Sequence, residues 1–185
     1  MEFEGEFLNG KRWYGRVYDR NTDNIKDIKN GTGNLKEFDI FGNLIFEGEY
    51  VNGKKNGKGK EFYENNTPEL KFEGEYLNDK RNGKGKEYYI NGKLIFAGEY
   101  LNSKRWKGKI YGKYNNNYSE LKGGKGFIKE YDEFNFIIYE CKYINGERNG
   151  KGKELTFFDE RLIYEYEYLN GKRHGIGMNI IMLVI

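Results

Sequence analysis

The sequence contains one cysteine and one histidine, and the scarcity of these residues excludes several kinds of protein. A single cysteine, Cys141, cannot form an internal disulfide framework, so the chain fits a reducing compartment and we expect a cytoplasmic protein. The lone histidine, His174, has no cluster of metal-ligating residues beside it, so we expect no metal and no cofactor. Cys141 also lacks a nearby base, so we expect no catalytic residue and no enzyme.

An excess of charge of one sign and a long apolar run are also missing. The chain has 32 basic and 29 acidic residues, a net charge of +3, which is far from the strongly basic composition of a nucleic-acid-binding protein. The last six residues are apolar, but a membrane-spanning helix needs about 20 such residues. The first motif begins at Phe3, so we expect no signal peptide.

Glycine and aromatic residues are abundant, with 26 Gly, 17 Tyr and 13 Phe, and they recur in one phrase. Recurrence at a period of about 20 to 50 residues predicts a repeat architecture in which each unit contacts only its neighbours. The repeats extend to about residue 178, so almost no room is left for a separate catalytic domain. The phrase Phe-Glu-Gly-Glu-Tyr-Leu-Asn-Gly-Lys-Arg-Asn-Gly-Lys-Gly-Lys starts, with small edits, at Phe3, Phe46, Phe72, Phe96, Tyr139 and Tyr164.

Each repeat has the pattern of a β-hairpin. In the third unit, ring-bearing and glycine residues alternate with others over residues 72–77, which is typical of a strand with its rings on one face. Residues 78–83 are turn-forming, and the alternation resumes over residues 84–89 as a return strand. An Asn-Gly pair at residues 91–92 then predicts a tight turn into the next unit. Successive hairpins therefore form an antiparallel meander.

The repeats are organised at a second level, because a shift of 93 residues superposes Trp13 on Trp106. We interpret this as the duplication of a three-unit block in one continuous array. We expect an elongated, single-layer, all-β sheet of about sixteen strands with essentially no helix. The predicted parts are a first block over residues 1–93, a second block over residues 94–178, contracted hairpins at residues 25–38 and 118–131, and an apolar tail over residues 179–185.

Glycine takes a fixed place between two aromatic residues in the first four units. A missing side chain at this place lets a neighbouring ring lie flat on the backbone. In the last two units Cys141 and Tyr166 occupy the place, so we predict tighter twist or altered ring packing there. The glycines concerned are Gly5, Gly48, Gly74 and Gly98.

The repeat resembles the MORN (membrane occupation and recognition nexus) repeat. The resemblance is carried by Phe46-Glu47-Gly48-Glu49-Tyr50 with Asn52-Gly53-Lys54-Lys55-Asn56-Gly57-Lys58-Gly59, and by equivalent residues in the other units. It implies a β-hairpin scaffold that tethers membranes, the cytoskeleton or partner proteins, and phospholipid binding has been proposed for the family. The chain departs from the family in one respect, because its second aromatic residue is Phe or Tyr and never Trp.

Two surfaces are candidates for contact with a partner. Basic residues fall on the same loop of successive hairpins, and they predict either a rim for an anionic membrane surface or simple solubility with cross-strand pairing to glutamates. These residues are Lys11, Arg12, Lys54, Lys55, Lys80, Arg81, Lys104, Arg105, Arg148, Lys172 and Arg173.

The second candidate is the aromatic face. A single layer cannot cover both of its faces, so we expect a partly exposed row of rings that serves as a groove for a helix or peptide, or for self-association. The row consists of Phe46, Tyr50, Phe72, Tyr76, Phe96 and Tyr100.

We therefore expect a non-enzymatic scaffold or adaptor that binds a protein or peptide partner and an anionic membrane surface, but no nucleic acid. Its expected location is the cytoplasm, peripheral to a membrane or the cytoskeleton. Uncapped edge strands also predict edge-to-edge self-association. The alternatives are an antitoxin or immunity-type protein that binds a toxin, and a fragment of a larger repeat protein.

Overall fold

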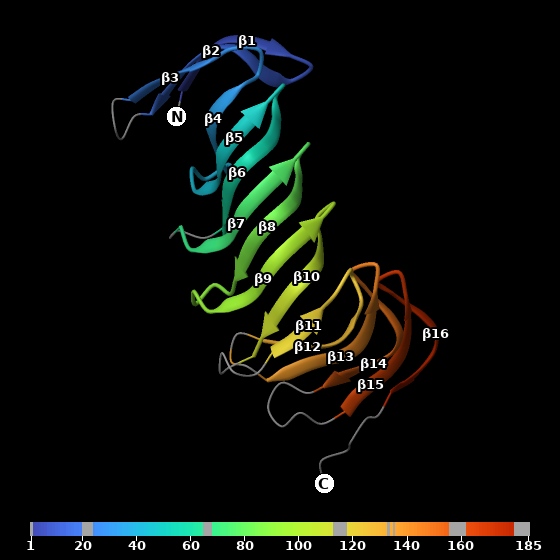
Figure 1. Ribbon diagram of the computed structural model, residues 1–185. Helices are drawn as coiled ribbons and strands as arrows, with labels where there is room; N and C mark the ends of the chain where they lie inside the picture. The colour runs from blue at the N-terminus through green and yellow to red at the C-terminus, as the bar shows by residue number, and fades with distance from the viewer. Residues whose placement is uncertain are drawn as a thin grey trace. The chain divides into compact units, whose positions relative to one another are not determined.

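The chain is built from β-strands, as the repeat pattern predicts. The computed structural model (Figure 1) describes residues 2–19, 24–64, 68–112, 118–132, 134, 136–155 and 162–179. These residues form sixteen antiparallel strands in open sheets and contain no helix, so the predicted all-β class is confirmed. Over the same residues there is accordingly no helix long and apolar enough to cross a membrane.

The chain divides into two compact units, residues 1–85 and 86–185, with β8 (Lys80–Tyr88) at the division. In the first unit, β1 to β3 form one sheet and β4 to β7 are consecutive neighbours in another. The strands of this unit are β1 (Glu2–Leu8), β2 (Lys11–Asp19), β3 (Asn24–Ile28), β4 (Gly33–Phe38), β5 (Leu44–Val51), β6 (Lys54–Phe62) and β7 (Leu70–Leu77).

In the second unit, β9 to β11 are consecutive neighbours and β12 to β16 form a five-stranded sheet. The predicted apolar tail, residues 179–185, lies outside the described residues except for Asn179, which ends β16. The two-block division at residue 93 stays a prediction. The strands are β9 (Leu94–Leu101), β10 (Lys104–Tyr111), β11 (Tyr118–Leu121), β12 (Gly126–Tyr131), β13 (Ile137–Ile144), β14 (Glu147–Leu155), β15 (Leu162–Leu169) and β16 (Lys172–Asn179).

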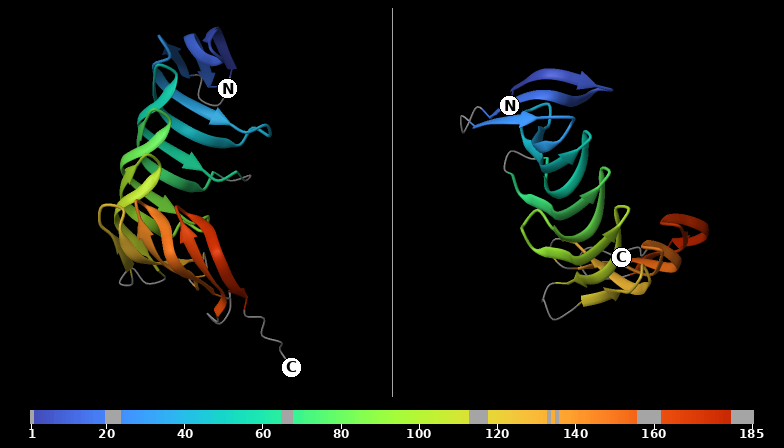
Figure 2. Two further views of the ribbon diagram at one scale, coloured as in Figure 1. Left: turned by 90° about the vertical axis from the view of Figure 1, so that its right-hand side faces the viewer. Right: turned by 45° about the horizontal axis from the view of Figure 1, so that its top comes forward.

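Aromatic rings lie on paired glycines in the middle of the hairpins, as the sequence predicts. Gly59 of β6 is in register with Gly48 of β5 and with Gly74 of β7. The tip of the Phe72 ring lies 2.6 Å from the position that a Cβ atom on Gly74 or Gly85 would occupy. A side chain at either glycine would therefore displace the ring. The strands of the β5–β6 hairpin are also curved along their length (Figure 2).

The expectation that the aromatic row is partly exposed is wrong. All six rings, Phe46 to Tyr100, are buried, and none is more than 6% exposed. Phe46 shows the reason, because it is met edge-on by Tyr50 and Tyr76 at centroid distances of 5.8 and 5.4 Å and is covered by the Lys55 ammonium at 3.8 Å. The curved layer thus covers its own aromatic face with neighbouring rings and cations, and this face forms the core. The six residues are Phe46, Tyr50, Phe72, Tyr76, Phe96 and Tyr100.

The predicted contracted hairpin at residues 25–38 contains two strands joined by a tight turn, and an antiparallel bridge between Lys29 and Thr32 closes that turn. β3 pairs with β2 and β4 pairs with β5, so one sheet ends and the next begins there. The turn backbone also binds both flanking hairpins, because the Gly31 N–H donates to the Trp13 carbonyl (2.7 Å) and the Gly31 carbonyl accepts from the Gly53 N–H (2.8 Å). Hydrogen bonds to the flanking hairpins thus fix the turn at a corner between the sheets.

The second block repeats this corner between β11 and β12, where an antiparallel bridge between Lys122 and Lys125 closes the turn within residues 118–131. There the Gly124 N–H donates to the Trp106 carbonyl (2.6 Å), and Gly146 N–H donates to Gly124 (2.9 Å). In both corners the tryptophan is the extra residue of a β-bulge, which aims its ring at the corner glycine. The two tryptophans of the chain therefore have the same structural role.

Ring packing changes where Tyr166 replaces glycine, as predicted. Tyr166 stacks on Tyr164 with an interplanar angle of 28°, whereas the Phe72–Tyr76 pair meets at 89°. The Tyr166 ring also lies across Gly177 of β16, 2.2 Å from where a Cβ atom would stand.

Candidate functional site

Each full hairpin ends in a two-residue turn, which we call a hairpin tip. The first residue of every tip is an asparagine with φ between 51 and 54°, and the second has φ between 67 and 78°. Positive φ at both residues is the type I′ geometry that continues the right-handed twist of the flanking strands. The tips are Asn9-Gly10, Asn52-Gly53, Asn78-Asp79, Asn102-Ser103, Asn145-Gly146 and Asn170-Gly171.

An aliphatic residue precedes each tip and a charged residue follows it, and we call these two residues a tip pair. Val51 faces Lys54 across the hairpin in this way. Five of the six aliphatic side chains are between 39 and 49% exposed, although leucine and valine are usually buried. The tip pairs are Leu8/Lys11, Val51/Lys54 and Leu77/Lys80 in the first unit, and Leu101/Lys104, Ile144/Glu147 and Leu169/Lys172 in the second.

The tip lysines divide into two groups. The stem of Lys11 lies against Gly53, and its ammonium is 3.6 Å from the Asp79 carboxylate. Lys104 likewise lies against Gly146 and is 2.9 Å from Glu147. These two lysines hold neighbouring hairpins together. The side chains of three other tip lysines are exposed and make no hydrogen bond or ion pair within the described part of the chain: Lys54, Lys80 and Lys172.

The second residue after most tips is basic and does not belong to the exposed rim that the sequence predicts. Arg81 is turned onto the aromatic face, where its side chain is only 16% exposed. Its guanidinium donates two hydrogen bonds to the Glu61 carboxylate, of 3.0 and 2.5 Å, and lies 4.1 Å from the Phe72 ring centroid. The Tyr76 hydroxyl donates to the same carboxylate at 2.5 Å. Arg81 therefore helps to close the core.

Each cluster of this kind takes its glutamate, its tyrosine and its cation from three consecutive strands, and such clusters recur along the chain. In the first unit a second cluster joins Glu37, Tyr50 and Lys55, with Lys55 3.0 Å from the carboxylate. Burial raises the pKa of Tyr50, and its hydrogen bond to Glu37 raises it further. In the second unit the clusters are Glu87–Tyr100–Arg105 and Glu130–Tyr143–Arg148.

The fifth cluster, at the end of the chain, is incomplete. Arg173 contacts Glu154 at 2.6 Å, but the carboxylate accepts its tyrosine hydrogen bond from Tyr139 at 2.9 Å. Tyr139 stands where earlier units have phenylalanine, so its hydroxyl competes for this carboxylate. The Tyr168 hydroxyl, which matches Tyr76 in position, is buried and makes no well-formed hydrogen bond among the described residues, although its interaction with Arg173 raises the pKa of that guanidinium.

The rim prediction is therefore wrong for the inward residues and undecided for the outward ones. Lys55, Arg81, Arg105 and Arg148 are each less than a quarter exposed and ion-paired. Arg12 is half-buried beside the Phe3 ring at 5.5 Å, whereas Arg173 is 51% exposed. The sequence did hold a signal for the clusters, because the cation always follows the cluster tyrosine by five residues, as in Tyr76 and Arg81.

Cys141 and His174 lie where no reactive constellation forms. Burial, as the largest cause, raises the pKa of the Cys141 thiol to about 12, which disfavours the nucleophilic thiolate. His174 is exposed on β16. No group of three or more His, Cys, Asp or Glu residues that could hold a metal ion occurs among the residues that the structure describes.

The fold and the tips define a class of protein, an all-β repeat protein whose hairpins stack through an aromatic–glycine core. The family model for the MORN repeat matches residues 3–13, 46–67, 72–93, 139–155 and 167–178. The chain is a MORN repeat protein, and the predicted resemblance is confirmed. It is therefore a repeat-type scaffold or binding protein in general, in a family that is generally non-catalytic. A search of curated proteins finds no match.

Proposed function

We propose that this protein is a non-enzymatic scaffold that docks on an anionic lipid surface through its hairpin tips. The supporting observation is the repetition of the tip pair, in which an exposed aliphatic side chain lies across the hairpin from a lysine. An aliphatic group that enters the headgroup region beside a lysine that binds phosphate is the combination found in interfacial segments.

Neighbouring tips are held in a fixed arrangement, which supports simultaneous engagement. In the first unit the Asp79 N–H donates to the Lys55 carbonyl at 3.0 Å, and the Asp79 carboxylate accepts from the Lys55 N–H at 2.8 Å. Lys54 and Lys80 therefore project from two tips whose backbones are joined. Each lysine near an anionic membrane contributes about 1 kcal/mol, so several together give useful binding although each alone is weak.

The test is co-flotation with phosphatidylserine-containing vesicles. Replacement of Lys54, Lys80 and Lys172 by serine should lower the vesicle affinity at low salt by about two orders of magnitude, since three contributions of about 1 kcal/mol are lost. The matched control replaces Lys58, Lys84 and Lys93 by serine, which removes the same charge from exposed positions away from the tips. Equal loss of affinity in both triple variants would show general charge attraction and reject docking through the tips.

A second experiment isolates the aliphatic half of the tip pair. Val51→Ser together with Leu77→Ser keeps every charge, so it should weaken vesicle binding at high salt, where electrostatic attraction is screened. Unchanged binding would contradict insertion of the tips. The wild-type protein should not float with vesicles of phosphatidylcholine alone.

A further inference from the structure

The turn between β4 and β5, residues 39–43, displays the two most exposed large apolar side chains of the described residues. Ile40 is 92% exposed and Phe41 is 83% exposed. The next in order is Phe7 at 62%. Adjacent apolar side chains in this position are unfavourable in water, and such patches mark contact sites.

The turn is rigid although its apolar side chains are exposed. The Asp39 carboxylate accepts hydrogen bonds from the Phe41 N–H (2.9 Å), the Asn43 N–H (2.8 Å) and the Asn43 side-chain amide (2.8 Å). The Asp39 N–H also donates to the Asn43 carbonyl at 2.9 Å, which closes the turn. A turn held in this way loses little conformational entropy when it binds, so Ile40 and Phe41 form a preorganised anchor.

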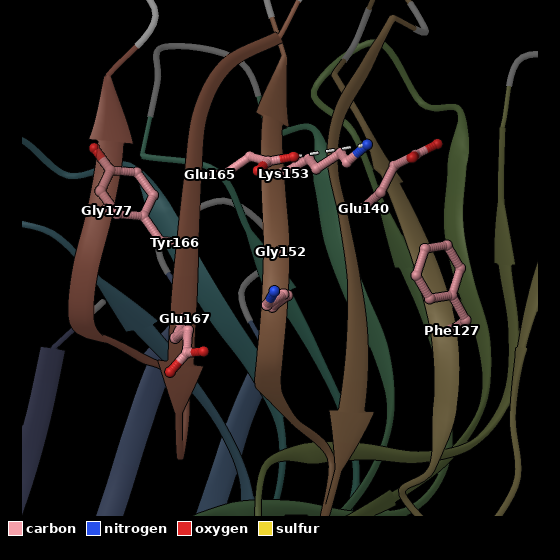
Figure 3. A pocket seen from close by; sticks show the side chains of 9 residues that line it. Phe127, Glu140, Gly152, Lys153, Glu165, Tyr166, Glu167 and Gly177 are labelled. Carbon is pink, nitrogen blue, oxygen red and sulfur yellow. Dashed lines mark ion pairs between the residues drawn. The ribbon is translucent and has the colours of Figure 1, made fainter.

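A groove of about 610 Å³ lies on the five-stranded sheet of the second unit. Figure 3 shows Gly152 of β14, which has no side chain, between Phe127 of β12 on one side and Tyr166 of β15 on the other. Phe127 is 61% exposed at the edge of this hollow. The groove is thus an apolar depression with charged residues around it: Glu140, Lys151, Lys153, Glu165 and Glu167.

The apolar sides of the groove, and Ile40 of the anchor, are departures from the internal duplication. The internal duplication places Phe127 opposite Asn34 and Tyr166 opposite Gly74, so the first block has neither aromatic side chain. In the reverse direction, Ile40 is matched by a glutamate in the second block, whereas Phe41 is matched by Phe134, which is 55% exposed. The first block therefore carries the anchor and the second block carries the groove.

The groove carries three glutamates and two lysines, but Glu140 and Glu165 are ion-paired with Lys129 and Lys153, so the single charge that suits the anchor is Lys151. Asp39 is the only charged residue between Phe38 and Phe46, so the anchor turn has a negative flank. Lys151 lines the groove, and its ammonium group makes no hydrogen bond or ion pair within the described part of the chain. We propose that Ile40 and Phe41 of one copy insert into the groove of a second copy, with Asp39 directed to Lys151. Because anchor and groove are different surfaces, the contact is heterologous.

Light scattering after size-exclusion chromatography tests this contact, with the purified protein as its own ligand. The wild-type mass should rise with protein concentration, and Phe41→Ser or Phe127→Ser should each keep the protein monomeric at those concentrations. A mixture of the two variants retains one intact anchor and one intact groove, so it should form a one-to-one dimer that does not grow. Ile25→Ser, which removes another exposed apolar side chain of the first unit, is the control and should behave as wild type.

A wild-type protein that stays monomeric at all concentrations overturns the proposal, as does a mixture that stays monomeric. An Ile25→Ser variant that loses assembly as strongly as Phe41→Ser also overturns it, because nonspecific association of exposed apolar side chains would then be the cause. The contact uses neither the tip lysines nor the tip aliphatics. Failure of the vesicle experiment would therefore leave this inference untouched, and the reverse also holds.

Discussion

At the scale of single residues, a charged side chain is buried or exposed according to the face of the sheet to which its strand position directs it. Lys80 and Arg81 are adjacent in the sequence, yet Lys80 is exposed and Arg81 lies in the core against Glu61. Successive residues of a strand point to opposite faces, so a run of two basic residues supplies one to each surface. Adjacent basic residues that together suggest an exposed rim therefore divide, and one residue is exposed while the other contributes to the core.

Arg81→Ala and Lys80→Ala should consequently differ in their effect on stability. Loss of Arg81 leaves the Glu61 carboxylate partly buried without its cation, so the free energy of unfolding should fall by about 2 kcal/mol or more. Loss of Lys80 should change it by less than about 0.5 kcal/mol. Urea denaturation of both variants checks this, and similar values for the two would contradict the assignment of Arg81 to the core.

At the incomplete fifth cluster, by contrast, we predict a substitution that increases the stability of the protein. Tyr168→Phe removes a buried hydroxyl that makes no well-formed hydrogen bond among the described residues, so the protein should become more stable by about 1 kcal/mol. Tyr76→Phe removes a hydroxyl that donates to Glu61, so it should destabilise by a similar amount. Thermal unfolding of the two variants provides the comparison. If Tyr168→Phe destabilises as Tyr76→Phe does, then the Tyr168 hydroxyl has a partner after all.

Residue patterns of this kind were only partly predictable. Alternation over residues 72–77 places the rings correctly on one face and predicts the glycines beneath them. It does not say that the sheet curves enough for Tyr76 to meet Phe46, because curvature depends on the whole layer. For this reason the rings were expected in an open groove, and the acids that pair with Arg81 and its equivalents were missed.

At the scale of elements, the corner glycines decide where one sheet ends. Gly124 has φ of 72°, and a Cβ atom there would stand 2.7 Å from the Gly146 nitrogen and 2.7 Å from the Trp106 ring. Its neighbour Gly123 has a similar φ of 57° but no atom within 4 Å of the same position. The two glycines thus share a backbone requirement and differ only in crowding.

Gly124→Ala should therefore destabilise the second unit far more than Gly123→Ala. Alanine at position 123 meets only the left-handed backbone penalty of about 1 kcal/mol. Alanine at position 124 must also push the Gly146 backbone aside, so we expect a loss of more than about 3 kcal/mol. Chemical denaturation gives the two values, and a red shift of tryptophan emission should accompany Gly124→Ala alone. Equal losses would mean that the corner is not closely packed.

The corners also mark the limit of prediction for elements. The turn residues at 30–31 and 123–124 show correctly that each contracted segment is strand, turn and strand. The two strands of each segment are bridged only beside the turn, and they then join different sheets. Here Trp13 and Gly53 take the hydrogen bonds of Gly31, and the equivalent residues do so in the second copy. Nothing in the local sequence reports these partners from distant hairpins.

At the scale of the whole molecule, the glutamate clusters occur in both units, so both should respond to acid in the same way. Burial alone would raise the pKa of Glu61 and Glu130, but hydrogen bonds and charge attraction from Arg81 and Arg148 outweigh it and hold both below the usual 4.5. A carboxyl group whose pKa is lower in the folded state stabilises the fold above its unfolded pKa. This contribution is lost as the pH falls through the folded pKa.

Stability should thus be nearly constant from pH 7 down to about 5, then fall steadily below about 4.5 as both carboxylates become protonated. The double variant Glu61→Gln, Glu130→Gln should be less stable at pH 7, and it should lose less than the wild type between about pH 5 and 3. Urea midpoints across this range measure both slopes. Glu75→Gln, at an exposed glutamate outside the clusters, is the control and should keep the wild-type slope. A double variant with an unchanged acid slope would place the acid sensitivity outside the clusters.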